Sequence, residues 1–152
     1  MREARPDISI TTDIIVGFPG ETDEDYQETR SMCERVKFDN AFVFRYSKRK
    51  DTPAAELEGQ LPERVKEERN QDLLALINKL SRPGYENLVG KTVEILCEGT
   101  SKTTESRLVG RTSSNRIVVF EGDKERHTGE LFDVKIRELH NFTLYGDAVL
   151  VG

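Results

Sequence analysis

The residues best placed for chemistry lie at a sharp corner near the start of the chain, in the stretch T-T-D-I-I-V-G-F-P-G-E-T-D-E-D. There Ile15 offers apolar surface to a purine, Gly17 lets a ligand approach the backbone, and Glu21 follows a Gly-Phe-Pro-Gly turn. In α/β folds, ligands bind at the carboxyl ends of strands, and the corner falls at such an end. It is either one wall of a ligand pocket or a tight turn without a ligand, since no glycine-rich phosphate loop is complete here.

Strand and helix signals surround this corner. The β-branched run predicts a strand over Thr12–Gly17. Thr22 is a good N-cap with Asp25 at capping-box spacing, which predicts a helix over Asp23–Val36. Aromatic and β-branched residues predict a second strand over Asn40–Tyr46. Strand, helix and strand form a βαβ unit, and we expect it to belong to a larger parallel sheet or barrel, because one unit cannot cover both faces of its sheet.

A long helix is predicted after a polar loop over Ser47–Leu61. Pro62 suits the first helical position, and Glu63–Ser81 then shows helical periodicity. We expect Arg82-Pro83-Gly84 to end this helix and to separate two domains, 1–84 and 85–152. The apolar stripe of the helix, on which the stem of one arginine would lie, comprises Val65, Arg69, Leu73, Leu76, Ile77 and Leu80.

The second half of the chain changes to a period of two residues. Five short apolar stretches separated by Gly-, Asn- and Ser-rich turns predict a small, closed, five-stranded β-barrel of the OB-like kind. Such barrels often bind single-stranded or looped nucleic acid. The predicted strands are Lys91–Cys97, Ser106–Thr112, Arg116–Phe120, Leu131–Leu139 and Phe142–Leu150.

Aromatic side chains end the second predicted strand of the first half. Alternation places Phe44 and Tyr46 on one side of the strand and Arg45 on the other. One of the aromatic rings, or the backbone beside it, would then lie against an adenine. The alternative is that Phe42 and Phe44 simply pack in a core.

Basic residues gather in two places. Lys48, Arg49 and Lys50 follow the second strand, and a further group surrounds two turns of the predicted barrel: Lys102, Arg107, Arg111 and Arg116. Both groups could neutralise RNA phosphates, while Asn115 would hold a left-handed turn. The alternative for each group is a solvated surface. The chain carries a net charge of −5, so any RNA contact must come from a local patch.

The remaining chemistry-bearing residues suggest no further site. Cys33 and Cys97 are far apart without a metal-ligand spacing, and we expect buried free thiols in a cytoplasmic protein. His127 and His140 have no carboxylate or cysteine at ligand spacing and are expected to be structural or exposed. We therefore predict no catalytic residue and no metal site here, and neither a signal peptide nor a membrane span.

Three stretches of the chain resemble, in the correct order, the C-terminal part of radical-SAM methylthiotransferases. They are T-D-I-I-V-G-F-P-G-E-T-D-E-D, F-D-N-A-F-V-F-R-Y-S-K-R-K-D-T-P-A-A, and the run from N-L-V-G-K-T-V-E-I-L-C-E-G to G-D-A-V-L-V-G. The first two resemble the end of the radical-SAM barrel, and the third is similar to a TRAM domain. Within the family, F-D-N-A-F-V-F-R-Y-S looks most like the MiaB branch.

The resemblance implies a tRNA-modifying activity for the parent protein. That branch adds a methylthio group to C2 of N6-isopentenyladenosine beside the anticodon, using S-adenosylmethionine and two 4Fe-4S clusters. It also implies that Ile15, Gly17, Glu21, Phe44 and Tyr46 contact the S-adenosylmethionine, and that the TRAM domain binds the anticodon stem-loop of tRNA. The branches acting on a ribosomal protein or on threonylcarbamoyl-adenosine remain alternatives, with the TRAM domain docking a protein or only bracing the barrel.

The resemblance also limits what this chain does by itself. The family's cluster-binding cysteines, CxxxCxxC among them, have no counterpart in the sequence, so neither cofactor is expected on the chain alone and it should be inactive. The lone βαβ unit should be the less stable half. Its uncovered sheet face and edges predict self-association.

Overall fold

The computed structural model describes residues 1–101 and 106–149. The chain divides into two compact units, Met1–Ser81 and Arg82–Gly152, each described here by itself. Within the described residues, no helix has the length and apolar character needed to cross a membrane.

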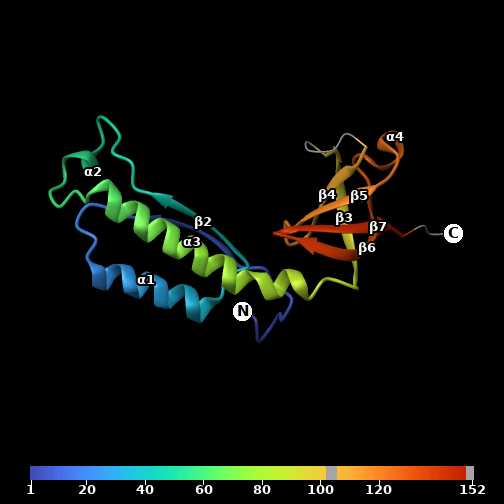
Figure 1. The fold of residues 1–152 in the computed structure, drawn as a ribbon, viewed down its shortest axis with the longest axis horizontal. Helices are drawn as coiled ribbons and strands as arrows, with labels where there is room; N and C mark the ends of the chain where they lie inside the picture. The colour runs from blue at the N-terminus through green and yellow to red at the C-terminus, as the bar shows by residue number, and fades with distance from the viewer. Residues whose placement is uncertain (102–105, 150–152) are drawn as a thin grey trace. The chain divides into compact units, whose positions relative to one another are not determined.

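The first unit is a βαβ unit with added helices (Figure 1). Its two strands pair in parallel, with Ile14 opposite Val43 and Ile15 opposite Phe44. The prediction of a βαβ unit followed by a long helix is confirmed; only the one-turn helix α2 inside the predicted loop was missed. The elements are β1 (Thr11–Val16), α1 (Asp23–Val36), β2 (Asn40–Arg45), α2 (Pro53–Glu56) and α3 (Glu63–Glu86).

Helix α1 begins and ends at residues that satisfy its terminal backbone groups. Thr22 accepts a hydrogen bond from the N–H of Asp25, whose carboxylate accepts one from the N–H of Thr22, so the predicted capping box is present. At the other end, Lys37 takes a left-handed conformation and donates its N–H to the carbonyl of Cys33.

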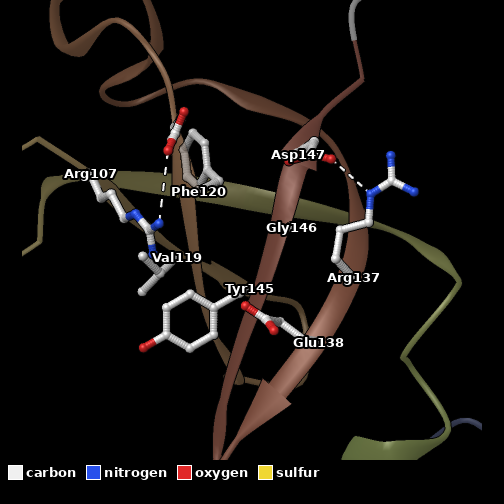
Figure 2. A pocket seen from close by; sticks show the side chains of 9 residues that line it. Arg107, Val119, Phe120, Arg137, Glu138, Tyr145, Gly146 and Asp147 are labelled. Atoms are coloured by element: carbon white, nitrogen blue, oxygen red, sulfur yellow. Dashed lines mark hydrogen bonds and ion pairs between the residues drawn. The ribbon is translucent and has the colours of Figure 1, made fainter.

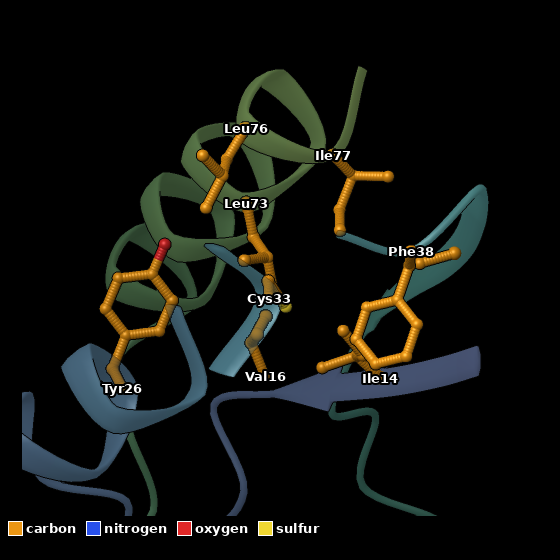
Figure 3. Packing of buried hydrophobic residues seen from close by; sticks show 9 residues of the cluster. Ile14, Val16, Tyr26, Cys33, Phe38, Leu73, Leu76 and Ile77 are labelled. Carbon is orange, nitrogen blue, oxygen red and sulfur yellow. The ribbon is translucent and has the colours of Figure 1, made fainter. Parts of the chain in front are cut away.

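The core of the first unit lies between the sheet and helices α1 and α3, as Figure 3 shows. Val16 of β1 lies next to Cys33 of α1 and Leu73 of α3, and Ile14 lies next to Phe38. The predicted stripe of α3 is thus confirmed at Leu73, Leu76 and Ile77, which are buried in this core. Successive strand residues face opposite sides, so the neighbouring positions turn away from this core.

The other face of the two-stranded sheet is apolar and open. The exposed fractions of Ile15, Phe42 and Phe44 are 57%, 59% and 52%. Core packing of Phe42 and Phe44 is therefore wrong for this chain, because the helices cover only the face that carries Ile14. The two phenylalanine rings instead stack on each other, with their centroids 6.4 Å apart.

Helix α3 continues through Pro83 to Glu86, so the predicted end at Ser81 is wrong. Proline lacks the N–H that would bond four residues back, which usually breaks a helix. Here the next turn is held by burial: Tyr85 packs in the core of the second unit, edge-on to Phe142 at 5.2 Å. Tertiary packing of this tyrosine outweighs the local signal of the proline.

The second unit is a closed barrel with the strand order β3-β4-β5-β7-β6. Neighbours pair antiparallel except β5 and β7, which run parallel. This confirms the predicted five-stranded, OB-like barrel. Its elements are β3 (Thr92–Thr100), β4 (Leu108–Thr112), β5 (Ile117–Glu121), the short helix α4 (Lys124–His127), β6 (Leu131–His140) and β7 (Thr143–Ala148).

Candidate functional site

The corner after β1 is closed by side chains from helices α1 and α3. The N–H of Gly17 donates a 2.8 Å hydrogen bond to Oε2 of Glu21, and Oε1 of Glu21 lies 2.5 Å from Nη1 of Arg69. Arg69 also contacts Asp23 at 2.6 Å and is 7% exposed. Gly17 has a φ of +75°, and a Cβ there would overlap the side chain of Lys66, so only glycine fits.

A pocket of about 620 Å³ lies beside this corner, at the carboxyl ends of β1 and β2. The structure brings together Ile15, Phe44 and Tyr46 in its wall, while Gly17 and Glu21 shape the corner without lining the pocket. The volume is typical of small-molecule sites. The full lining comprises Ile15, Phe18, Phe44, Arg45, Tyr46, Ser47, Arg49, Thr52 and Ala54.

Tyr46 is the buried polar residue of this pocket. Its ring packs edge-on to Phe18 at 5.2 Å, and Nζ of Lys66 lies 5.4 Å from its centroid. The residue is 8% exposed, and its hydroxyl has no hydrogen-bond partner in the described part of the chain. Burying a hydroxyl without a partner costs about 1–3 kcal/mol, so this atom is an energetically unfavourable feature beside the pocket.

The basic run after β2 is exposed. Lys48, Arg49 and Lys50 all reach solvent, and Arg49 also lines the pocket. The Arg49 carbonyl accepts a 2.8 Å hydrogen bond from the hydroxyl of Thr52, which fixes the path of this loop. The run thus presents positive charge next to the pocket mouth.

Two of the predicted RNA-contacting arginines of the barrel are ion-paired. Arg107 lies 3.8 Å from Glu121, and its guanidinium stands 5.8 Å from the ring centroid of Tyr145. Arg111 lies 3.1 Å from Glu98. Strands β4 and β5 pair as a hairpin. Arg107 comes just before β4 and Arg111 lies near its end, so the two are about 13 Å apart along an extended strand.

Arg116 has a different partner, since its guanidinium stacks over the ring of Tyr85 at 4.9 Å. Asn115 before it has a φ of +61°, which confirms the predicted left-handed turn. Lys102 lies outside the described residues. The described arginines of this group therefore spread around the hairpin, each near an acidic or aromatic side chain.

A second hollow, of about 170 Å³, lies on the outer surface of the barrel over β5, β7 and β6 (Figure 2). Arg107 was the one residue there singled out from the sequence. Tyr145, Arg137 and Glu138 were missed, because a lone tyrosine in a strand carries no motif. The lining comprises Arg107, Val119, Phe120, Glu121, Arg137, Glu138, Tyr145, Gly146 and Asp147.

The cysteines and histidines occupy structural positions. Both thiols are buried, and burial raises the pKa of Cys33 and of Cys97, so they are protonated near neutral pH. His127 contacts the rings of Phe120 and Phe132, and exposed His140 lies 3.1 Å from Glu138. Across residues 1–101 and 106–149, no group of three or more His, Cys, Asp or Glu side chains could hold a metal ion.

A buried phenol–carboxylate contact ties α1 to α3. The hydroxyl of Tyr26 lies 2.6 Å from Oδ2 of Asp72, which also pairs with Arg30 at 2.8 Å. Burial and the hydrogen bond to Asp72 raise the pKa of Tyr26, while the bonds from Arg30 and Tyr26 lower that of Asp72. The contacts among Tyr26, Asp72 and Arg30 stabilise the packing of α1 against α3. Tyr26 and Asp72 line neither the pocket at the β1 corner nor the hollow of the barrel.

Residues 86–149 match the family model of the TRAM domain. Over 146 residues the chain is 56% identical to a tRNA-2-methylthio-N(6)-dimethylallyladenosine synthase of Akkermansia muciniphila, covering 96% of this chain and 32% of that protein. A synthase of the same name from Acetivibrio thermocellus is 48% identical over 149 residues, covering 98% and 31%. The chain thus spans about a third of the length of the curated relatives that it matches.

Among solved structures, the apo form of Mycoplasma genitalium RNase R matches with a TM-score of 0.34 and 12% identity. The match covers 59% of this chain and 20% of that one.

Proposed function

Because this chain belongs to the MiaB family of tRNA methylthiotransferases, as homologue of its C-terminal 150 or so residues with the TRAM domain, we propose that it serves the same reaction. That reaction places a methylthio group on C2 of N6-isopentenyladenosine next to the anticodon. The observation that carries the proposal is the 56% identity over nearly the whole chain, across both units.

In this proposal the first unit supplies one wall of the S-adenosylmethionine site. Ile15 and Phe44 offer exposed apolar surface to the adenine, and Tyr46 completes the wall beside them. Gly17 and Glu21 act one step away, because their mutual hydrogen bond holds the corner that carries Ile15. When bound, S-adenosylmethionine would supply the methyl group and the radical chemistry, while these residues bind and orient it.

The residues of this chain do not fit a 4Fe-4S cluster. Such clusters are held by sets of cysteine thiolates, whereas Cys33 and Cys97 are buried thiols in different units. We therefore assign no step of cluster chemistry to this chain and expect it to be inactive alone. The cluster ligands would come from a part of the parent protein that corresponds to the unmatched two thirds of its relatives.

The barrel is proposed to bind the tRNA. Support comes from the match of residues 86–149 to the TRAM model and from arginines spread over one hairpin, Arg107, Arg111 and Arg116. Lys48 and Arg49 would add contacts beside the cofactor wall. The ion pairs of Arg107 and Arg111 are solvent-accessible, so phosphates can replace their carboxylate partners at low cost.

A chimera tests the proposed reaction. The matching C-terminal region of the Akkermansia enzyme is replaced by this chain, and tRNA from a methylthiotransferase-deficient strain expressing the chimera is digested and measured by mass spectrometry. We expect 2-methylthio-N6-isopentenyladenosine from the chimera and none from this chain alone. A chimera that is folded and loaded with clusters but forms a methylthiolated threonylcarbamoyl-adenosine, or no methylthio nucleoside, would contradict the proposal.

Salt dependence tests the RNA contact of the chain itself. Binding to an anticodon stem-loop should weaken as salt rises, with a log–log slope of about −2 if three phosphates are neutralised. The triple variant of Arg107, Arg111 and Arg116 to alanine should flatten that slope, while Arg64→Ala, an exposed arginine of α3, should leave it unchanged. Salt-independent binding would argue against the RNA role.

A further inference from the structure

We propose that the hollow over β5, β7 and β6 binds one unpaired RNA nucleobase, stacked on Tyr145, and that Glu138 selects bases carrying an exocyclic amino group (Figure 2). The inference rests on the proposed tRNA contact of the barrel and deepens it, because it assigns a base-reading subsite in addition to phosphate contacts.

Tyr145 is built as a platform. Leu144 before it is fully buried in the barrel, so alternation along β7 turns the ring of Tyr145 outward. The ring is half-buried: the guanidinium of Arg107 lies over one face, 5.8 Å from the centroid, and the ring of His140 packs edge-on at 5.4 Å. Aromatic platforms of this kind stack unpaired bases, at about 1–3 kcal/mol per base.

A β-bulge brings two consecutive residues of β6 to the same hollow. Regular alternation would send Arg137 and Glu138 to opposite faces, yet both line it. The register with β7 shifts between Ile136 and Glu138, which leaves Arg137 as the extra residue and places Glu138 opposite Tyr145. Gly146 permits this close approach, because a Cβ there would overlap the backbone carbonyl of Lys135.

The charges around the hollow favour a neutral base over a phosphate. Arg137 is paired with Asp147 at 2.7 Å, and Arg107 lies near Glu121. With Glu138 added, the lining carries more carboxylates than guanidinium groups. Arg107 can still exchange Glu121 for a phosphate of the bound RNA, but the rest of the lining repels a phosphate, whereas the face of a base meets the ring of Tyr145.

Glu138 gives the subsite a chemical preference. An ionised carboxylate only accepts hydrogen bonds, and one of its oxygens, Oε2, lies near His140 at 3.1 Å. The other oxygen can accept from the exocyclic amino group of cytosine, adenine or guanine, whereas uracil presents a carbonyl oxygen there. The volume of about 170 Å³ is below that of drug-sized sites and suits a single ring system.

Short single-stranded oligonucleotides test the inference on the whole chain. Fluorescence anisotropy compares six-residue cytidine and uridine runs with an abasic backbone of equal length and charge. We expect cytidine to bind more tightly than uridine and the abasic backbone most weakly. Tyr145→Leu should lower the affinity for both base-bearing runs about tenfold or more. Tyr145→Phe should keep it, and Glu138→Gln should abolish the difference between cytidine and uridine.

Leu131→Ala is the matched control, since Leu131 is a 62% exposed residue of β6 outside the hollow and should leave all affinities unchanged. Circular dichroism and thermal unfolding establish that each variant folds. If Tyr145→Leu does not fold, the loss of the cytidine–uridine difference in Glu138→Gln, at an exposed residue, decides the test. A folded Tyr145→Leu protein with wild-type affinity, or equal binding of the abasic backbone, overturns the base subsite while the tRNA contact stands. A wild-type chain that binds no RNA overturns both.

Discussion

The two units of this chain differ in whether the edges of their sheets are paired. In the second unit every strand pairs on both sides, so the barrel has no edge and its inward residues form a single core. In the first unit, two parallel strands have one neighbour each, and only one face is covered by helices. The barrel buries its own apolar residues. By contrast, no part of the described chain covers the apolar open face of β1 and β2.

The difference places a candidate site in each unit. The pocket of the first unit lies on the side left open by its helices, where Ile15 and Phe44 are exposed. The hollow of the barrel lies on its outer surface, where a bulge interrupts an otherwise regular strand pair. An uncovered face and a local irregularity are therefore the two structural signals that mark candidate sites here.

The largest expected effect comes from equivalent core truncations in the two units. Leu73→Ala in α3 and Leu144→Ala in β7 each remove a fully buried side chain, and each should cost about 2–5 kcal/mol. Hydrogen exchange should show the loss in the mutated unit, and the wild-type first unit should exchange faster than the barrel. Equal loss of protection in both units from either variant would show that they unfold as one body.

A smaller effect is expected when the buried ion pair at the β1 corner is broken. Arg69→Leu leaves the half-buried carboxylate of Glu21 without its partner and should cost about 3 kcal/mol, measured by urea unfolding. Arg64→Leu is the control, because its pair with Glu68 is exposed and should contribute little. Similar losses from the two variants would refute a structural role for the corner network.

We predict that the first unit loses stability at alkaline pH. The folded state raises the pKa of Tyr26 above its ordinary 10.0, because burial and the hydrogen bond to Asp72 favour the neutral phenol. This stabilisation is complete below pH 10 and is lost as the pH rises toward the folded pKa. Tyr26→Phe should cost about 1–2 kcal/mol at neutral pH and flatten the decline of stability above pH 10. An unchanged alkaline decline would mean that another group causes it.

The smallest effect on stability is expected on the open face. The double variant Phe42→Thr and Phe44→Thr should change the free energy of unfolding by no more than about 0.5 kcal/mol, since both rings are exposed. Sedimentation equilibrium should nevertheless show weaker self-association than in the wild type. Leu131→Thr, on the exposed surface of the barrel, should leave self-association unchanged. Weaker self-association of Leu131→Thr, together with wild-type self-association of the double variant, would place the self-associating surface on the barrel.

Much of the fold could be predicted because periodicity and caps act locally. The capping box of α1, the buried stripe of α3 and the alternation of the barrel strands all follow from neighbouring residues. The end of α3 could not, because the signal of Pro83 is local and the burial of Tyr85 that outweighs it is tertiary.

The candidate sites were less accessible to sequence reasoning. Ile15, Phe44 and Tyr46 lie at the ends of two adjacent strands, so the strand order together with the family resemblance was sufficient to suggest that they lie near one another. The barrel hollow depends on a register shift between β6 and β7, which places Glu138 opposite Tyr145. The register shift cannot be predicted from the residues of β6, L-F-D-V-K-I-R-E-L-H. In the partner strand, Gly146 alone indicates a close approach of the two backbones.

The central claim, that the barrel carries the RNA contact of this chain, is tested most directly by NMR. Isotope-labelled protein is titrated with an anticodon stem-loop, and the amide shifts are mapped along the chain. We expect the largest changes within residues 86–149, around Arg107, Arg116 and Tyr145, with smaller ones at Lys48 and Arg49. Saturating RNA that shifts the first unit alone, or no residue of the barrel, would contradict this claim.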